Sequence, residues 1–382
     1  MEFSLPFIPT DAEQQQPLAQ EYLNNAGNLA TATLQARRAN KGQSGSTWGT
    51  DEVHAVRAIP IINVEPKRIV PERHFPRSDD QNFARLRQSA RAADIDALKT
   101  YSGDEFQGNP FQLFFEDLAE LVTTFTSEET IKNAHRRRIS DSSVETDLST
   151  SSNEGKGESV SVNAVKNFIK AILPRMGELR HLPTQGPVKP SLMCYSATAR
   201  FEWKMAGVSH VAINDGFVGV NFQGNFSGSN RKTEIPVASL ECKTRHAGGI
   251  RRGSGQPEHF IDEIFAREVA ELIGNMAAQR SVQGLLTDQH QDQQSFVISM
   301  HGALLYISAA YFSPEYIQYI EANDFTQLDV SRILLWVRRS VHFDLKDVGQ
   351  RVQALELVWA LLDYIASGEA RLNIVSAAIN AV

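Results

Sequence analysis

Residues 235–243 read Ile-Pro-Val-Ala-Ser-Leu-Glu-Cys-Lys, an apolar run that ends in two charges flanking a cysteine. The run is short, apolar and preceded by a polar turn, which predicts a buried strand. Side chains two apart on a strand share a face, so Glu241 and Lys243 should point one way and Cys242 the other. Charges at the tip of a core strand are costly unless paired or functional. Glu241 and Lys243 form either a structural ion pair or a site for a hard cation, a water and a phosphate.

Asp215 lies one predicted strand upstream of Glu241. Residues 208–214 and 217–222 are two apolar, β-rich runs separated by Asp215-Gly216. A two-residue Asp-Gly step between such runs is a strong hairpin signal. A turn can also place its carboxylate at the end of the strands of a sheet. Asp215 is therefore interpreted either as a turn residue or as a metal ligand.

An acidic residue at a strand start, followed by Glu-x-Lys on the next strand and then by a helix, resembles the PD-(D/E)XK nuclease superfamily, and in particular its fungal nuclease-like branch. The resemblance covers about residues 160–370, with Asn214 where the family has its proline. It implies a restriction-endonuclease-like α/β/α core. It also implies that Asp215 and Glu241 bind Mg²⁺ or Mn²⁺, and that Lys243 orients or activates the attacking water.

Composition limits the classes of protein that the chain can belong to. Its 382 residues carry a net charge of −7, which excludes a polyanion binder that uses its whole surface. Two cysteines exclude a disulfide framework. The sequence starts without a basic, apolar leader and has no apolar run of about 18 residues. We therefore expect an intracellular protein without a membrane span, with nucleus and cytoplasm both open.

The chain divides into four parts by composition. Residues 1–80 are rich in Gln, Pro, Ser, Arg and Asn, which predicts a mostly disordered arm that protein partners could bind. Residues 81–134 have helical spacing and should dock on the main domain. Residues 135–159 form a serine-rich, acidic linker. Residues 160–382 form the nuclease-like domain.

Periodicity predicts an α/β domain with a mixed sheet flanked by helices. The expected elements of residues 160–382 are a helix over 162–176, strands over 192–203, 209–222 and 235–244, a helix over 257–279, a hairpin over 296–312, and helices over 314–322 and 347–367.

Residues around the Glu-x-Lys strand extend the candidate site. The segment 231–252 has six basic residues and two acids, a net charge of +4, and Arg245, Arg251 and Arg252 lie in its glycine-rich part. A flexible basic loop of this kind can bind phosphates, which makes nucleic acid the expected partner. Glu202 and Glu268 are possible accessory acids. The predicted function is metal-dependent hydrolysis of nucleic-acid phosphodiesters. The alternative is an inactive nuclease-like scaffold that binds protein or nucleic acid.

Overall fold

The structure is a computed structural model of the chain. It describes residues 44–123, 150–176, 191–205, 207–221, 236–243, 261–281, 290–322 and 333–380. No helix in these ranges is long and apolar enough to cross a membrane.

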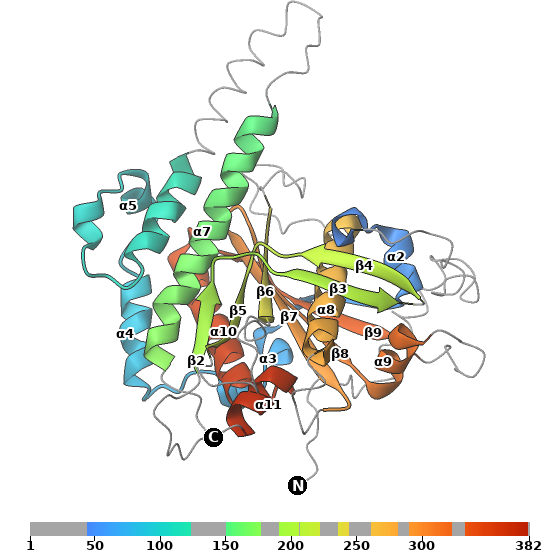
Figure 1. Cartoon of the computed structure of the whole chain (residues 1–382). Helices are drawn as coiled ribbons and strands as arrows, with labels where there is room; N and C mark the ends of the chain where they lie inside the picture. Colours follow the sequence, from blue (N-terminus) through green and yellow to red (C-terminus); the bar gives the residue numbers. More distant parts are fainter. Residues whose placement is uncertain are drawn as a thin grey trace, which may run out of the picture.

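An eight-stranded mixed sheet forms the centre of the protein (Figure 1). Its strand order is β1-β9-β8-β7-β6-β5-β2, with β10 paired to β8. The pairs β1–β9 and β6–β7 are parallel and the others are antiparallel. The strands are β1 (Ala58–Val64), β2 (Ser191–Tyr195), β5 (Gly216–Asn221), β6 (Pro236–Lys243), β7 (Gln293–His301), β8 (Leu304–Phe312), β9 (Leu335–Ser340) and β10 (Phe343–Asp344).

Helices cover both faces of the sheet, and each face has its own apolar core. On one face lie α3 (Pro66–Ile69), α4 (Gln81–Ala90), α5 (Ile95–Lys99), helical residues 112–123, α7 (Thr150–Met176), α10 (Val348–Ala366) and α11 (Asn373–Asn380). On the other lie α2 (Thr50–Ala55), α8 (Asp262–Ser281), α9 (Pro314–Glu321) and a separate two-stranded sheet of β3 (Arg200–Met205) and β4 (Val208–Ile213). The short 3₁₀ helices are η1 (Gly45–Thr47), η2 (Glu72–His74) and η3 (Gly103–Phe106). The predicted mixed sheet flanked by helices is confirmed.

Local sequence explains where several elements begin. The side chain of Asp347 accepts a hydrogen bond from the Gln350 amide, and that of Ser313 accepts one from Tyr316, so each caps its helix. Pro314 occupies the first turn of α9, where its missing amide costs nothing. The predicted hairpin over 296–312 is confirmed as β7 and β8, which turn at Gly302 with φ +58°.

The expectation of a mostly disordered arm over 1–80 is wrong for residues 44–80. These residues supply strand β1, which pairs with β9 at one edge of the sheet, and Trp48, which is 2% exposed in the core beside α8. The segment lacks a long periodic pattern because its elements are short and are stabilised by distant partners. Residues 1–43 lie outside the described residues.

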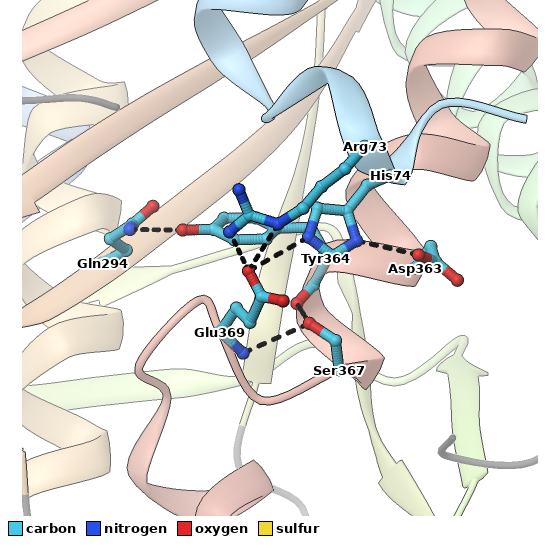
Figure 2. Close-up of polar contacts among 7 residues, drawn as sticks. All are labelled: Arg73, His74, Gln294, Asp363, Tyr364, Ser367 and Glu369. Atoms are coloured by element: carbon cyan, nitrogen blue, oxygen red, sulfur yellow. Dashed lines mark hydrogen bonds and ion pairs between the residues drawn. The ribbon is translucent and has the colours of Figure 1, made fainter. Parts of the chain in front are cut away.

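A buried histidine holds the 3₁₀ helix η2 against the end of α10 (Figure 2). His74 Nδ1 lies 2.8 Å from Asp363 Oδ2, and its Nε2 lies 3.3 Å from Glu369 Oε2. Arg73 also pairs with Glu369, and the ring of Tyr364 lies 5.0 Å from the imidazole. These contacts join η2 to the end of α10 and to the turn that follows it.

The predicted boundaries at 135–159 and 160 also differ from the structure. Helix α7 begins at Thr150, so the last ten residues of the expected linker, 150–159, are helical. Phe111 and Phe114 contact Phe168 of α7 at ring distances of 5.6 and 5.0 Å. The helical residues between 81 and 123 therefore share one core with the sheet, and do not dock as a separate unit. Residues 124–149 lie outside the described residues.

Two predicted strands are each divided in the structure. The expected strand 192–203 is β2 and β3, and the expected strand 209–222 is β4 and β5. Strands β4 and β5 belong to different sheets, so Asp215-Gly216 joins two sheets and does not close a hairpin. Gly216 lacks the positive φ that such a turn requires, and a Cβ there would come within 2.5 Å of Lys166 Cε. The backbone carbonyl oxygen of Tyr195 would lie 3.1 Å from the same Cβ, so the neighbouring strand also approaches this glycine closely.

Candidate functional site

The candidate site lies at the carboxyl ends of the parallel strands β6 and β7. Lys243 is in register with His301, and the Gly302 amide donates to the Lys243 carbonyl at 3.0 Å. Ligand sites of α/β sheets are commonly found at this end of parallel strands. Cys242 packs into the apolar core on the α7 side, so it faces away from Glu241 and Lys243 as the alternation of a strand requires.

Glu241 and Lys243 form a close, buried ion pair. Lys243 Nζ lies 2.7 Å from Glu241 Oε1, and the two side chains are 16% and 6% exposed in that order. A second carboxylate, Glu158 of α7, lies 3.1 Å from the same ammonium. Burial lowers the pKa of Lys243, but the charge and hydrogen bond of Glu241 outweigh it and raise that pKa above its usual value. Lys243 is therefore a permanent cation between two acids.

Asp215 lies against the end of β6, at the level of Glu241. Its amide donates to the Leu240 carbonyl at 2.9 Å, and its Oδ2 accepts from the Cys242 amide at 2.7 Å. Burial and the charge of Glu241 raise the pKa of Asp215 to about 6, although Lys243 and the Cys242 amide oppose this. Of the two interpretations drawn from the sequence, the hairpin turn is excluded, and the structure brings Asp215 to Glu241 and Lys243.

Glu271 of α8 is a carboxyl of this site that the sequence reasoning missed. It is 3% exposed and forms a side-chain hydrogen bond with Glu241. Burial and the charges of Glu241 and Asp215 raise its pKa well above the usual value, so it holds the proton of that bond. The available signal was spacing, because Glu268, Glu271 and Asn275 follow one another at about one turn along a helix whose other buried residues are mostly apolar.

Negative charge exceeds positive charge in this cluster. The acids Asp215, Glu241 and Glu158 lie around the ammonium of Lys243, and the protonated carboxyl of Glu271 adds no charge of its own. Oxygen donors of this kind suit Mg²⁺, which uses one or two carboxylates and retains several waters. Glu271 Oε2 is buried and has no hydrogen-bond partner among the described residues. One carboxyl oxygen that could ligate a metal ion is therefore unused. The donor set therefore fits a hard divalent cation.

The geometry does not hold a complete set of metal ligands. Within the described ranges, no group of three or more His, Cys, Asp and Glu side chains is arranged to bind a metal ion. A site on Asp215 and Glu241 would depend on water for its remaining ligands. Lys166 of α7 adds a second positive charge near Asp215, with its Nζ donating to the Ser196 carbonyl at 3.0 Å and its pKa lowered by burial.

Glu268 belongs to a different, fully buried network. Its carboxylate accepts hydrogen bonds from Ser299, Tyr306, Ser308 and Arg339, the last at 2.8 Å, and it is 0% exposed. Burial opposes ionisation, but Arg339 and Tyr306 outweigh it and lower the pKa of Glu268. This network joins α8 to β7, β8 and β9, which gives Glu268 a structural role.

The remaining predicted site residues are not brought to the cluster by the described structure. Glu202 lies on β3, outside the main sheet, where its 67% exposed side chain pairs with Arg200. Arg245, Arg251 and Arg252 lie outside the described residues. Glu158 was missed because composition placed it in a linker, and no local signal marks it.

Comparison with known proteins adds no relative, since no family model and no curated protein matches the sequence. The chemistry of the site follows from its own groups. Buried carboxylates can hold a hard cation, and a lysine at the same strand end can donate to a water or a phosphate oxygen.

Proposed function

We propose that the protein hydrolyses nucleic-acid phosphodiesters with Mg²⁺ or Mn²⁺ as its cofactor. The observation that carries the proposal is the excess of buried carboxyl groups around Lys243 at the end of β6. Like charges in a poorly hydrated site raise one another's pKa, and a divalent cation would relieve that repulsion. Structural ion pairs do not require this surplus of acids.

The order of the helices and strands also supports the proposal of a nuclease. The resemblance to PD-(D/E)XK nucleases implies the order helix, three strands, helix, two strands, helices. Here α7 is followed by β2, β5 and β6, then by α8 and β7, with β3 and β4 as an excursion between β2 and β5. The Glu-x-Lys strand lies next to the strand that follows α8 and runs parallel to it. This order favours a restriction-endonuclease-like core.

Each side chain has a role in the proposed reaction. Asp215 and Glu241 would hold the cation, which supplies charge for the scissile phosphate and lowers the pKa of a water. Lys243 has a compact ammonium that can donate to that water or to a phosphate oxygen. Glu271 carries the proton of its hydrogen bond to Glu241 in the metal-free protein, and Glu271 would release this proton as the cation enters.

The test is Glu241→Gln, which keeps the shape of the side chain and removes its charge. Cleavage of plasmid DNA, single-stranded DNA and RNA is measured in Mg²⁺, in Mn²⁺ and in EDTA. Glu202→Gln is the matched control, because Glu202 is exposed and pairs only with Arg200 among the described residues. We expect cleavage to disappear in Glu241→Gln and to persist in the control, with unchanged circular dichroism. Metal-dependent cleavage by purified Glu241→Gln would refute the proposal.

A specific observation favours the alternative of an inactive scaffold. Lys243 is already engaged by Glu241 at 2.7 Å and by Glu158 at 3.1 Å, and such an arrangement can simply close the end of the sheet. In that case the wild type would bind nucleic acid or protein and would cleave nothing in any divalent cation. A protein partner on residues 1–43 stays a prediction, since these residues lie outside the described ranges.

A further inference from the structure

A cleft of about 380 Å³ lies between α4, the loop before it and α10, and nothing in the proposed hydrolysis uses it. Its walls include Arg77, Arg87, Arg91, Phe83, Pro76 and Glu356. Pockets that bind small ligands begin at about 300 Å³ and combine an apolar surface with a few polar groups. The cleft therefore has the size and the composition of a ligand site.

The three arginines outnumber the two acids of the lining, Asp80 and Glu356, so the cleft has a net positive charge. Arg87 and Arg91 are four residues apart, so they lie on the same side of α4, where like charges repel. All three are exposed, and the described part of the chain offers no acidic side chain in an ion pair with any of them. Guanidinium groups that converge on a concavity suit phosphate oxygens, which they can contact in pairs.

The apolar part of the lining, here called the apolar floor, consists of Pro76, Ala84 and the largely buried Phe83. The ring of Phe83 packs edge-on against Trp359 with centroids 5.3 Å apart, and it is 5% exposed. Asp80 is already used as the helix cap, since its Oδ1 accepts from the Phe83 amide at 3.0 Å. Glu356 of α10 provides an acceptor on another wall.

We propose that this cleft binds a nucleoside phosphate, either as a free nucleotide or as one residue of a nucleic-acid strand. The arginines would bind the phosphate, the apolar floor would cover one side of the base, and Glu356 would accept from an amino group of the base. An inorganic anion or a phosphorylated peptide would use only the arginines. This binding requires neither a metal ion nor cleavage, so it stands or falls independently of the proposed hydrolysis.

The experiment measures binding to the full chain by calorimetry, in EDTA and low salt, so that no hydrolysis occurs. The probes are adenosine 5′-monophosphate, a 5′-phosphorylated oligoadenylate, inorganic phosphate and a phosphoserine peptide. The test variants are Arg87→Gln and Arg91→Gln. The matched control is Arg85→Gln, which removes one exposed arginine of the same helix that does not line the cleft.

We expect the dissociation constant for the nucleotide to rise about tenfold in each test variant, because each variant loses one charge-assisted contact to the phosphate. In the control it should stay within about twofold of the wild-type value. Tighter binding of the oligonucleotide than of the free nucleotide would identify a strand as the ligand, and the reverse would identify a free nucleotide. The proposal is overturned if the wild type binds no nucleotide, if phosphate or the phosphopeptide binds as tightly, or if Arg85→Gln weakens binding equally. Melting temperatures of the variants show whether any loss comes from unfolding.

Discussion

Asp215→Asn should stabilise the metal-free protein at neutral pH, because Asp215 ionises beside other carboxyl groups in a partly buried site. Its pKa rises from the usual 3.8 to about 6, through burial first and the charge of Glu241 second. An acid whose pKa is raised on folding weakens the folded state above its unfolded pKa. The shift corresponds to about 3 kcal/mol at pH 7.5, reduced to about 2 kcal/mol by the partial exposure of the group. The amide oxygen of asparagine can still accept from the Cys242 amide, so the local hydrogen bond is retained.

The assay is urea denaturation of wild type and Asp215→Asn in EDTA, at pH 7.5 and at pH 5. The penalty falls as the pH drops through about 6 towards 4, so the gain in the variant should roughly halve at pH 5. Adding Mg²⁺ should raise the stability of the wild type and leave Asp215→Asn unchanged, since ligand binding stabilises only the protein that binds it. Glu202→Gln is the control and should change stability by less than about 0.5 kcal/mol.

One result would refute this reasoning. If Asp215→Asn is less stable than the wild type in EDTA at pH 7.5, the carboxylate is a favourable structural acceptor. The excess of negative charge would then be compensated within the protein, and the site would not require a cation.

Four further predictions test other parts of the structure. Lys243→Arg should keep most of the stability but lose most of any cleavage activity. Equal cleavage rates in the variant and the wild type would show that Lys243 serves only as an ion-pair partner, since a guanidinium also pairs well with a carboxylate. Glu268→Ala should cost about 3–5 kcal/mol in denaturation experiments, because it leaves Arg339 buried without its acid, and a smaller loss would show that Arg339 finds water. Glu369→Gln should cost about 1 kcal/mol at pH 7. Arg73 and His74 overcome burial and lower the pKa of Glu369, so the cost should begin to fall below the pKa of the unfolded carboxyl and vanish below the lowered pKa of the folded one. A cost independent of pH would contradict this. Trp48→Ala should lower the free energy of unfolding by about 3–5 kcal/mol if residues 44–64 belong to the core. An unchanged melting temperature would show that this segment does not contribute to the core.

Local pattern was sufficient for the elements that carry their own periodicity. Helices α8 and α10 and the hairpin of β7 and β8 have long apolar faces or runs, so the sequence predicts them within a few residues. The Glu241-x-Lys243 step was visible for the same reason, since charges that end an apolar strand break a strong pattern. Asp215 was identified as a candidate, but its turn interpretation failed because the change of sheet after β4 has no local signal.

Tertiary structure alone decided which residues meet. Strand β1 contains Pro60, which argues locally against a strand, so only its pairing with β9, far along the chain, makes it a strand. Glu271 and Glu158 reach Glu241 and Lys243 from two helices on opposite faces of the sheet, a convergence that no spacing in the sequence encodes. The sequence determined which side chains could do chemistry at the end of β6. The packing of α7 and α8 determined how many carboxyl groups surround one lysine, because pKa values and charge balance depend on distances between residues that are remote along the chain.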